Sequence, residues 1–209
     1  MLSSRAAVVN ASSLHPEFSG LSRLSRLITY YYNLHDWLTV MEALALAGTR
    51  LLVASGFPKT VRRQLGKLAL IHPAYNLSGL RVRLLSTPQS YTWNYAHMAD
   101  PTTADHWGGQ LERLKNSTEW REGQSQVALL ACGAYGLPLA RHAKSRNISS
   151  IYVGGILPLL FGIAGKRHRE LPQFSSHINH HWVSPLPEES PHGKENVEGG
   201  AYWRRSRQR

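Results

Sequence analysis

The sequence predicts an α/β protein with a Rossmann-like, three-layer fold, a mainly parallel sheet and a long C-terminal loop. Three apolar runs, at residues 49–55, 127–131 and 149–153, each lead into glycine and then into a segment with helical spacing. Strands that alternate with helices in this way are typical of βαβ units. The composition agrees with one folded domain, because 42% of the 209 residues are hydrophobic and only 18% are charged.

The first half of the chain contains two of the expected strands. Residues 21–47 are expected to hold helices, and the apolar run 49–55 reads as a buried strand. Pro58 stands where a first helical turn would begin, and residues 59–70 carry helical spacing. Residues 80–85 alternate apolar side chains with arginines, which predicts a half-exposed strand.

The second half continues the same alternation and then loses it. Residues 100–122 have a polar start and a helical middle, and helices are expected at 137–145 and 156–163, after the second and third apolar runs. Residues 171–203 are rich in Pro, His, Ser and Glu, which predicts a long loop. Right-handed crossovers would bring the carboxyl ends of the strands to one edge, where ligands bind in such sheets.

The two ends of the chain differ from its middle. We expect an N-terminal extension at 1–35, a Rossmann-like domain at 36–203 and a basic tail at 204–209. Residues 1–26 contain many serines, three arginines and one acidic residue, a composition that resembles an organellar transit peptide, although a loosely ordered extension explains it equally well. The expected location is therefore cytoplasmic, or organellar if this segment directs import.

The net charge and the hydropathy limit the partners. No stretch is long and apolar enough to span a bilayer. The formal net charge of +11 attracts polyanions in general. It does not by itself indicate a specific nucleic acid, so we rank nucleic-acid binding last.

The segment Cys132-Gly133-Ala134-Tyr135-Gly136, after the second apolar run, is the best candidate ligand site. Glycine at a strand end lets a ligand approach the backbone, and the following helix N-terminus suits a phosphate group. The alternative is a tight turn without a ligand. Cys132 reads as a small buried residue rather than a nucleophile, because the nearest base in sequence, His142, lies about two helical turns away.

Acidic residues gather in the C-terminal third, at Glu188, Glu189, Glu195 and Glu198. In a basic protein such carboxylates could act as a general base or hold a divalent metal. Acids on a surface loop explain them as well, and position along the chain does not separate the two interpretations.

Several blocks together resemble the GT-D-like domain family, which is related to GT-D-fold glycosyltransferases. They read LLVASGF (51–57), ALLACGAYGLPLA (128–140), GGILPLLFGIAGKR (154–167), HWV (181–183) and VEGGAYW (197–203). The resemblance covers about residues 36–203. Within it, the chain resembles an N-terminally truncated or divergent member of the family.

The resemblance implies a nucleotide-sugar donor, a glycan acceptor and a role in glycan or polysaccharide synthesis, with Mn²⁺ or Mg²⁺ as a candidate cofactor. The positions that it implies for ligand binding are Gly133, Tyr135, Gly136, Gly154, Gly155, Lys166 and Arg167. Its candidate catalytic residues are Glu188 and Glu198, in a loop that also holds Gly199 and Gly200.

The sequence departs from the family in one respect. GT-D enzymes carry an Asp-x-Glu metal motif, and here none of Asp36, Asp100 and Asp105 has glutamate two residues later. No metal ligand is therefore assigned. The alternative function is a catalytically inactive binding or scaffolding domain. A Rossmann-fold methyltransferase ranks lower, because it would want an acidic residue where this chain has Gly154-Gly155.

Overall fold

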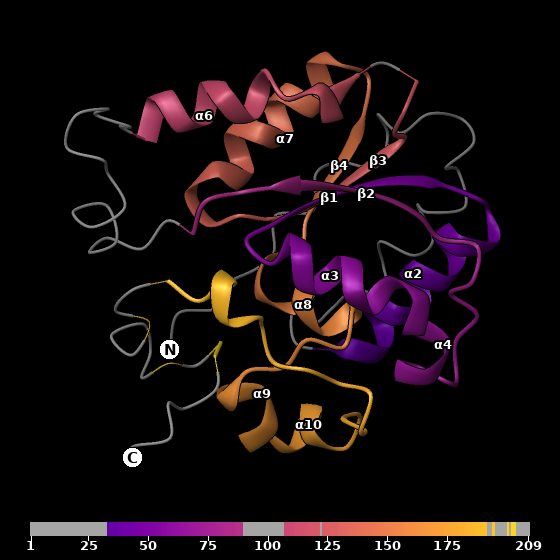
Figure 1. Cartoon of the computed structure of the whole chain (residues 1–209). Coiled ribbons are helices and arrows are strands. Elements are labelled where there is room, and N and C mark those ends of the chain that lie inside the picture. Colours follow the sequence, from indigo (N-terminus) through magenta and orange to yellow (C-terminus); the bar gives the residue numbers. More distant parts are fainter. Residues whose placement is uncertain are drawn as a thin grey trace, which may run out of the picture.

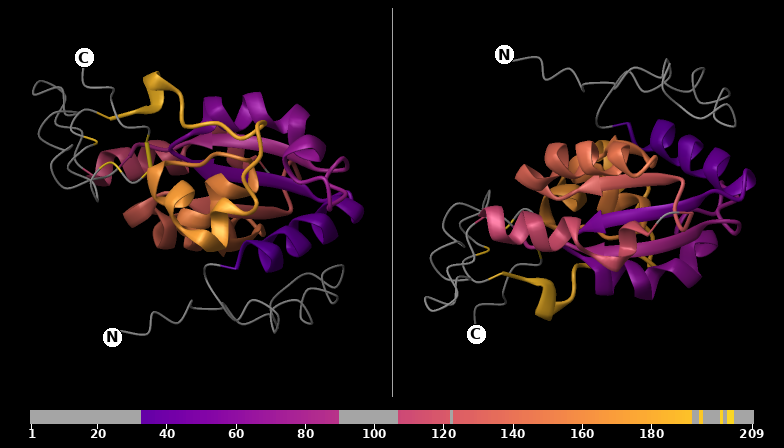
Figure 2. Two further views of the ribbon diagram at one scale, coloured as in Figure 1. Left: turned by 90° about the horizontal axis from the view of Figure 1, so that it is seen from below. Right: turned by 90° about the horizontal axis from the view of Figure 1, so that it is seen from above.

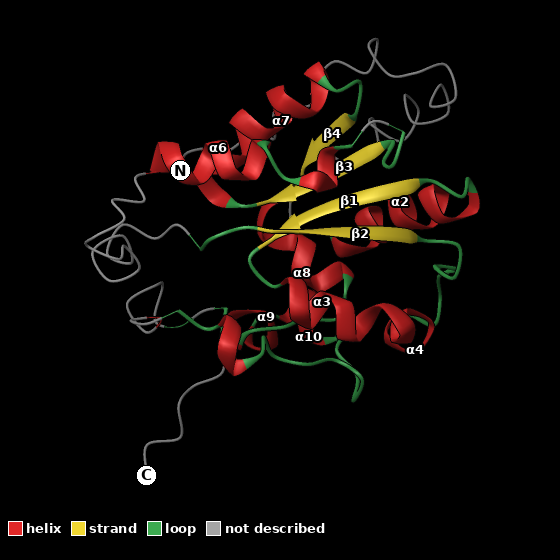
Figure 3. Cartoon of the chain, turned by 45° about the horizontal axis from the view of Figure 1, so that its top comes forward, coloured by secondary structure: helices red, strands yellow, loops and turns green. Residues whose placement is uncertain are grey.

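The computed structural model describes residues 33–89, 107–121, 123–191, 194, 200 and 202–203. In these residues four strands form one parallel sheet with the order β2-β1-β3-β4, and their arrowheads point the same way (Figure 3). The strands are β1 (Arg50–Ser55), β2 (Arg81–Ser86), β3 (Val127–Ala131) and β4 (Ser149–Tyr152). The α/β fold class with a parallel sheet is confirmed.

Helices cover both faces of the sheet, which makes three layers (Figure 1). One outer layer holds α6 (Trp107–Lys115) and α7 (Gly136–Ser145). The other holds α2 (Leu34–Leu46), α3 (Pro58–Gln64), α4 (Leu68–Ile71) and α8 (Leu157–Leu160), with α9 (Lys166–Glu170) and α10 (Pro172–Ser175) farther from the sheet. Short 3₁₀ turns are η3 (Leu65–Lys67), η4 (Thr118–Trp120), η5 (Gly133–Tyr135), η6 (Gly154–Ile156) and η7 (Pro187–Glu189).

The central strands are apolar throughout because both of their faces are covered. Successive side chains of a strand point to opposite faces, so Leu51 and Val53 join the core on the α2/α8 side, whereas Leu52 and Ala54 join the core on the α6/α7 side. All four side chains are fully buried. A continuous apolar run is what a parallel strand with helices on both faces requires.

The edge strands are less buried, and β2 has the half-exposed pattern that its alternating arginines predict. Three helices, α3, α6 and α8, are shorter than the segments 59–70, 100–122 and 156–163 in which the sequence predicts them. Helix α8 ends at Leu160 instead of reaching Ile163, because Gly162 adopts a φ of +66° and the amides of Gly162 and Ile163 turn back to the carbonyls of Leu159 and Pro158 at 3.0 and 2.9 Å. A Cβ at Gly162 would lie 2.6 Å from Ile71 Cγ2, so the close packing there also favours glycine.

The C-terminal loop wraps the α3/α8 layer and is anchored by buried aromatic side chains (Figure 2). Phe174, Trp182 and Trp203 are at most 5% exposed and belong to the same core as α2 and α8. Val183 forms a parallel bridge with Ile163, and Gln64 of α3 donates to the carbonyl of His181 at 3.0 Å. No helix in the described ranges is long and apolar enough to cross a membrane.

Candidate functional site at the carboxyl edge of the sheet

The strand order places a switch point between β1 and β3. The chain moves from β1 to β2 on one side, and β3 then pairs with the other side of β1. In doubly wound sheets, ligands bind in the crevice at the carboxyl ends of the strands on either side of such a reversal. Here those ends continue into two turns, the β1–α3 turn (Ser55-Gly56-Phe57) and the β3–α7 turn (132–136). The structure therefore places the sequence-predicted turn at this edge.

The β3–α7 turn exposes only Gly133 and Ala134. Gly133 adopts a φ of +53°, which favours glycine, and Gly133 and Ala134 are exposed. The amide of Tyr135 closes the turn on the carbonyl of Cys132 at 3.1 Å. The Tyr135 ring is 1% exposed and stacks on Trp107 of α6, with ring centroids 5.6 Å apart. Tyr135 thus contributes to the core, and the surface that a ligand could reach is the backbone at 133–134.

The space beside Gly136 is filled by the ring of Tyr152 and not left open for a ligand. A Cβ at this position would lie 2.1 Å from Cε2 of Tyr152, at the end of β4. Gly154, with a φ of +63°, and Gly155 follow Tyr152 at the same edge, because β4 pairs with β3. The glycines after β3 and those after β4 therefore share one edge, as predicted, with the Tyr152 ring over the start of α7.

Cys132 does not behave as a reactive thiol. The residue is 5% exposed, and burial raises the pKa of its thiol to about 12. A nucleophilic cysteine needs the opposite shift, produced by a nearby positive charge or a helix N-terminus. The interpretation of Cys132 as a small core residue is supported.

The β1–α3 turn is closed by a carboxylate from the C-terminal loop. The N-cap of α3 is Phe57, whose side chain has no atom that could accept a hydrogen bond from the amides of the first turn. Glu189 takes that role: its Oε1 accepts from the Lys59 amide at 2.6 Å, and its Oε2 accepts from the Thr60 amide at 3.0 Å and from the Thr60 hydroxyl. Glu189 is only 9% exposed. Its carboxylate therefore satisfies the free N–H groups that begin the helix.

Two further contacts hold η7 over this turn. The Gln89 side-chain amide, after β2, donates to the carbonyl of Gly56 at 3.1 Å and to that of Glu189 at 2.7 Å. The Leu186 amide donates to the Thr60 hydroxyl oxygen at 3.0 Å. Segments from three parts of the chain thus meet at the carboxyl end of β1.

The sequence places Glu189 among the acidic residues of the C-terminal third, but it does not predict that this carboxylate closes the β1–α3 turn, and the candidate catalytic residue there is its neighbour Glu188. Glu188 is exposed and has no hydrogen bond among the described side chains. A signal did exist: Pro58 starts a helix whose N-cap is Phe57, so the N–H groups of that turn need an acceptor from elsewhere. The sequence does not say which carboxylate supplies it.

The basic pair lies apart from the glycine turn. Lys166 and Arg167 begin α9, which lies on the opposite side of the sheet from α7 (Figure 1). Lys166 Nζ is 4.0 Å from Glu170 Oε1, and its amide donates to the Trp203 carbonyl at 3.4 Å. The structure brings the pair to the C-terminal loop and not alongside Gly133.

The remaining expected site residues belong to the loop 198–200, of which the structure describes only Gly200. Glu198 and Gly199 fall outside the described residues, and Gly200 adopts a φ of +79° and accepts from the Trp203 amide. In the described part of the chain, no three His, Cys, Asp or Glu side chains are grouped so as to hold a metal ion.

Two buried histidines hold the C-terminal loop in place. His72 pairs with the Leu159 carbonyl at 3.2 Å and packs edge-on against Trp182. His168 accepts from the Gly165 amide at 3.2 Å and packs edge-on against Phe174 and Tyr202. Burial lowers the pKa of each from 6.5 to about 4, so both are neutral at pH 7.

No protein-family model matches the chain, and neither a curated protein nor a solved structure matches it.

Proposed function

We propose that the chain is a glycosyltransferase-like domain that binds a nucleotide sugar at the carboxyl edge of its sheet. One observation carries the proposal: the order β2-β1-β3-β4 puts a switch point beside an exposed glycine turn, Gly133-Ala134, that precedes α7. The blocks that resemble the GT-D-like family supply the ligand class, a nucleoside diphosphate linked to a sugar. The backbone of this turn offers N–H groups and close approach to a diphosphate.

A second function, a binding or scaffolding domain without turnover, has its own support. Glu189, a carboxylate at the carboxyl end of β1, is committed to the backbone of α3, and no group of metal-binding side chains occurs in the described ranges. A diphosphate leaving group needs positive charge for stabilisation. Under this alternative the domain binds the nucleotide sugar but does not cleave it.

The test measures binding of UDP, UDP-glucose and GDP-mannose to the full chain by calorimetry, with and without Mn²⁺. Ala134→Glu adds charge and bulk to the turn, and Ala47→Glu makes the same change at an exposed position next to the opposite edge. We expect saturable binding that Ala134→Glu weakens at least about tenfold and that Ala47→Glu leaves unchanged. If none of the three nucleotides binds, the proposal is overturned.

The same protein distinguishes the two functions. Release of UDP from UDP-glucose is measured with Mn²⁺ and with Mg²⁺, both alone and in the presence of glycan acceptors. Release that requires the metal and is lost in Ala134→Glu supports the enzyme. Binding without release supports the non-catalytic domain.

A further inference from the structure

The outward surface of the helical run 58–71 carries charge of one sign. From residue 59 to residue 67 its exposed positions are Lys59, Arg62, Arg63, Gly66 and Lys67. The positions between them include Val61 and Gln64, which are buried against the domain. Exposed positions that recur every three to four residues form one helical face. We name Lys59, Arg62, Arg63 and Lys67 the basic ridge.

No acidic side chain balances the basic ridge from its own helix. Residues 58–71 contain no Asp or Glu. The ion pairs seen among the described residues join other groups: Arg83 to Glu119, Lys115 to Glu112 and Lys166 to Glu170. Glu189 approaches the start of the ridge, but its carboxylate bonds to the backbone of Lys59 and Thr60. Solvated helices usually mix both signs of charge, as α6 does with Glu112 and Lys115.

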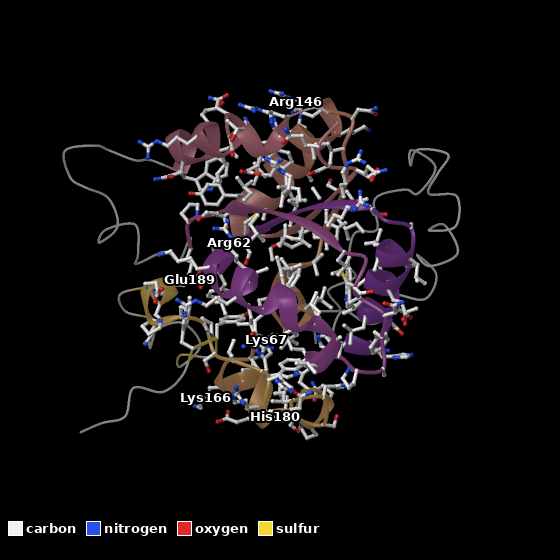
Figure 4. All side chains as sticks on the ribbon, turned by 45° about the vertical axis from the view of Figure 1, so that its right-hand side comes forward. Arg62, Lys67, Arg146, Lys166, His180 and Glu189 are labelled. Carbon is white, nitrogen blue, oxygen red and sulfur yellow. The ribbon has the colours of Figure 1, made fainter. Side chains whose placement is uncertain are left out.

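The basic ridge starts at the candidate site and leads away from it. Lys59 lies in the first turn of α3, directly after the β1 carboxyl end, and Lys67 lies eight residues farther along the run. At about 1.5 Å per residue in α3 and about 2.0 Å in η3, the two are about 13 Å apart along the run, and Lys59 and Arg63 are separated by about 6 Å. Arg62 and Lys67 follow this line in Figure 4, whereas Arg146 lies on the opposite layer. A linear anion with one end at the carboxyl edge would lie along these cations.

We propose that the basic ridge binds the acceptor of the reaction and that this acceptor is an acidic glycan, with carboxylate or phosphate groups spaced along its chain. The inference rests on the proposed function, in which the donor lies at the same edge. The exposed positions from residue 59 to residue 67 are Lys, Arg and Gly only. They offer no aromatic surface for stacking of bases, which single-stranded nucleic-acid sites combine with positive charge.

The experiment compares two triple variants of the full chain that lose equal charge. Arg62→Ala/Arg63→Ala/Lys67→Ala removes most of the ridge but leaves Lys59, which adjoins the donor site. Arg141→Ala/Lys144→Ala/Arg146→Ala removes three exposed cations from the end of α7. The probe is a fluorescently labelled oligogalacturonate, and the comparison ligands are a neutral maltooligosaccharide of the same length and oligo(dT). Circular dichroism verifies the fold of each variant.

We expect the wild type to bind oligogalacturonate more tightly than either comparison ligand, with affinity that falls as salt rises. The ridge variant should bind it at least about tenfold more weakly, and the α7 variant within about twofold of wild type. Equal loss in both variants, or tighter binding of oligo(dT) or of the neutral glycan, would overturn the inference. UDP affinity of the ridge variant should be unchanged. A wild-type chain that binds UDP but not oligogalacturonate would refute the acceptor site alone. A wild-type chain that binds none of UDP, UDP-glucose and GDP-mannose would refute the proposed function itself.

Discussion

The two turns that flank the switch point solve the same problem in different ways. At the β1–α3 turn, free N–H groups of the helix are satisfied by Glu189, which lies about 130 residues away in the sequence. At the β3–α7 turn no side chain caps the helix, and the chain turns through Gly133 with its backbone exposed. A carboxylate already occupies the first turn, so the second has more room for an external anion.

The difference also divides structural from ligand-binding roles at one edge. Glu189 and Gln89 tie the C-terminal loop to β1, which makes the first turn part of the scaffold. Gly133 and Ala134 are exposed, and within the described ranges no backbone hydrogen bond joins them to a distant segment, so a ligand can contact them without displacing such a bond.

Acidification should have the largest effect, because it loosens the C-terminal loop that carries Glu189. Burial lowers the pKa of His72 and His168 from 6.5 to about 4. Unfolded imidazoles take up protons below 6.5 while the folded ones do not, so stability is complete above pH 6.5 and falls as the pH drops. We expect a loss of about 4 kcal/mol between about pH 7 and about pH 5, measured by urea unfolding.

The matched control for this prediction replaces His72 by glutamine, which keeps a hydrogen-bond donor but does not titrate. The loss of stability in His72→Gln over the same interval should be about half that of the wild type. An unchanged pH profile would mean that His72 is not protected from protonation in the folded protein.

Removal of the carboxylate should destabilise the first turn strongly. Glu189→Ala leaves the N–H groups of Lys59 and Thr60 without their acceptor, and we expect a loss of about 3 kcal/mol in the free energy of unfolding. Glu189→Gln keeps one acceptor oxygen and should lose less. The control Glu188→Ala changes an exposed neighbour and should cost under about 0.5 kcal/mol. Equal losses at 188 and 189 would contradict the closing role of Glu189.

At the second turn, the contact between Gly136 and Tyr152 predicts a smaller and reversible effect. Gly136→Ala places a Cβ 2.1 Å from the Tyr152 ring, which must swing outward. We expect a loss of about 1–2 kcal/mol, most of which is recovered when Gly136→Ala is combined with Tyr152→Ala. Gly108→Ala, at an open helical position, should instead stabilise the protein slightly. Additive effects at 136 and 152 would contradict a direct clash.

Much of the fold could be predicted from the sequence because its signals are local. The apolar runs around Val53, Leu129 and Ile151 reflect burial within the sheet, and the glycines that follow them mark the turns. Helix α8 is shorter than the predicted segment 156–163, because Gly162 takes the left-handed conformation that ends it, with a φ of +66°. This glycine is a local signal, and the predicted helix runs past it.

The candidate site could be predicted only in part, because some of it depends on contacts between segments that are distant in the sequence. The glycine turn after β3 carries a local signal, and the structure places it at the switch point. The closing of the β1–α3 turn by Glu189 depends on the path of the C-terminal loop, which no periodicity encodes. The same path decides that Lys166 lies beside Trp203 instead of the glycine turn.

Substitution of Cys132 should have the smallest effect on stability, and it tests whether the thiol at the second turn has a chemical role or only a packing role. Because burial raises the pKa of its thiol to about 12, the native protein should react with iodoacetamide at least about a hundredfold more slowly than the unfolded chain. Cys132→Ala should cost about 1 kcal/mol of stability and leave the affinity for UDP within about twofold. A ligand that contacts the backbone of Gly133 and Ala134 has no need of the thiol. If Cys132→Ala abolished turnover while UDP affinity remained, the buried side chain would take part in the chemistry, and the turn would be more than a binding surface.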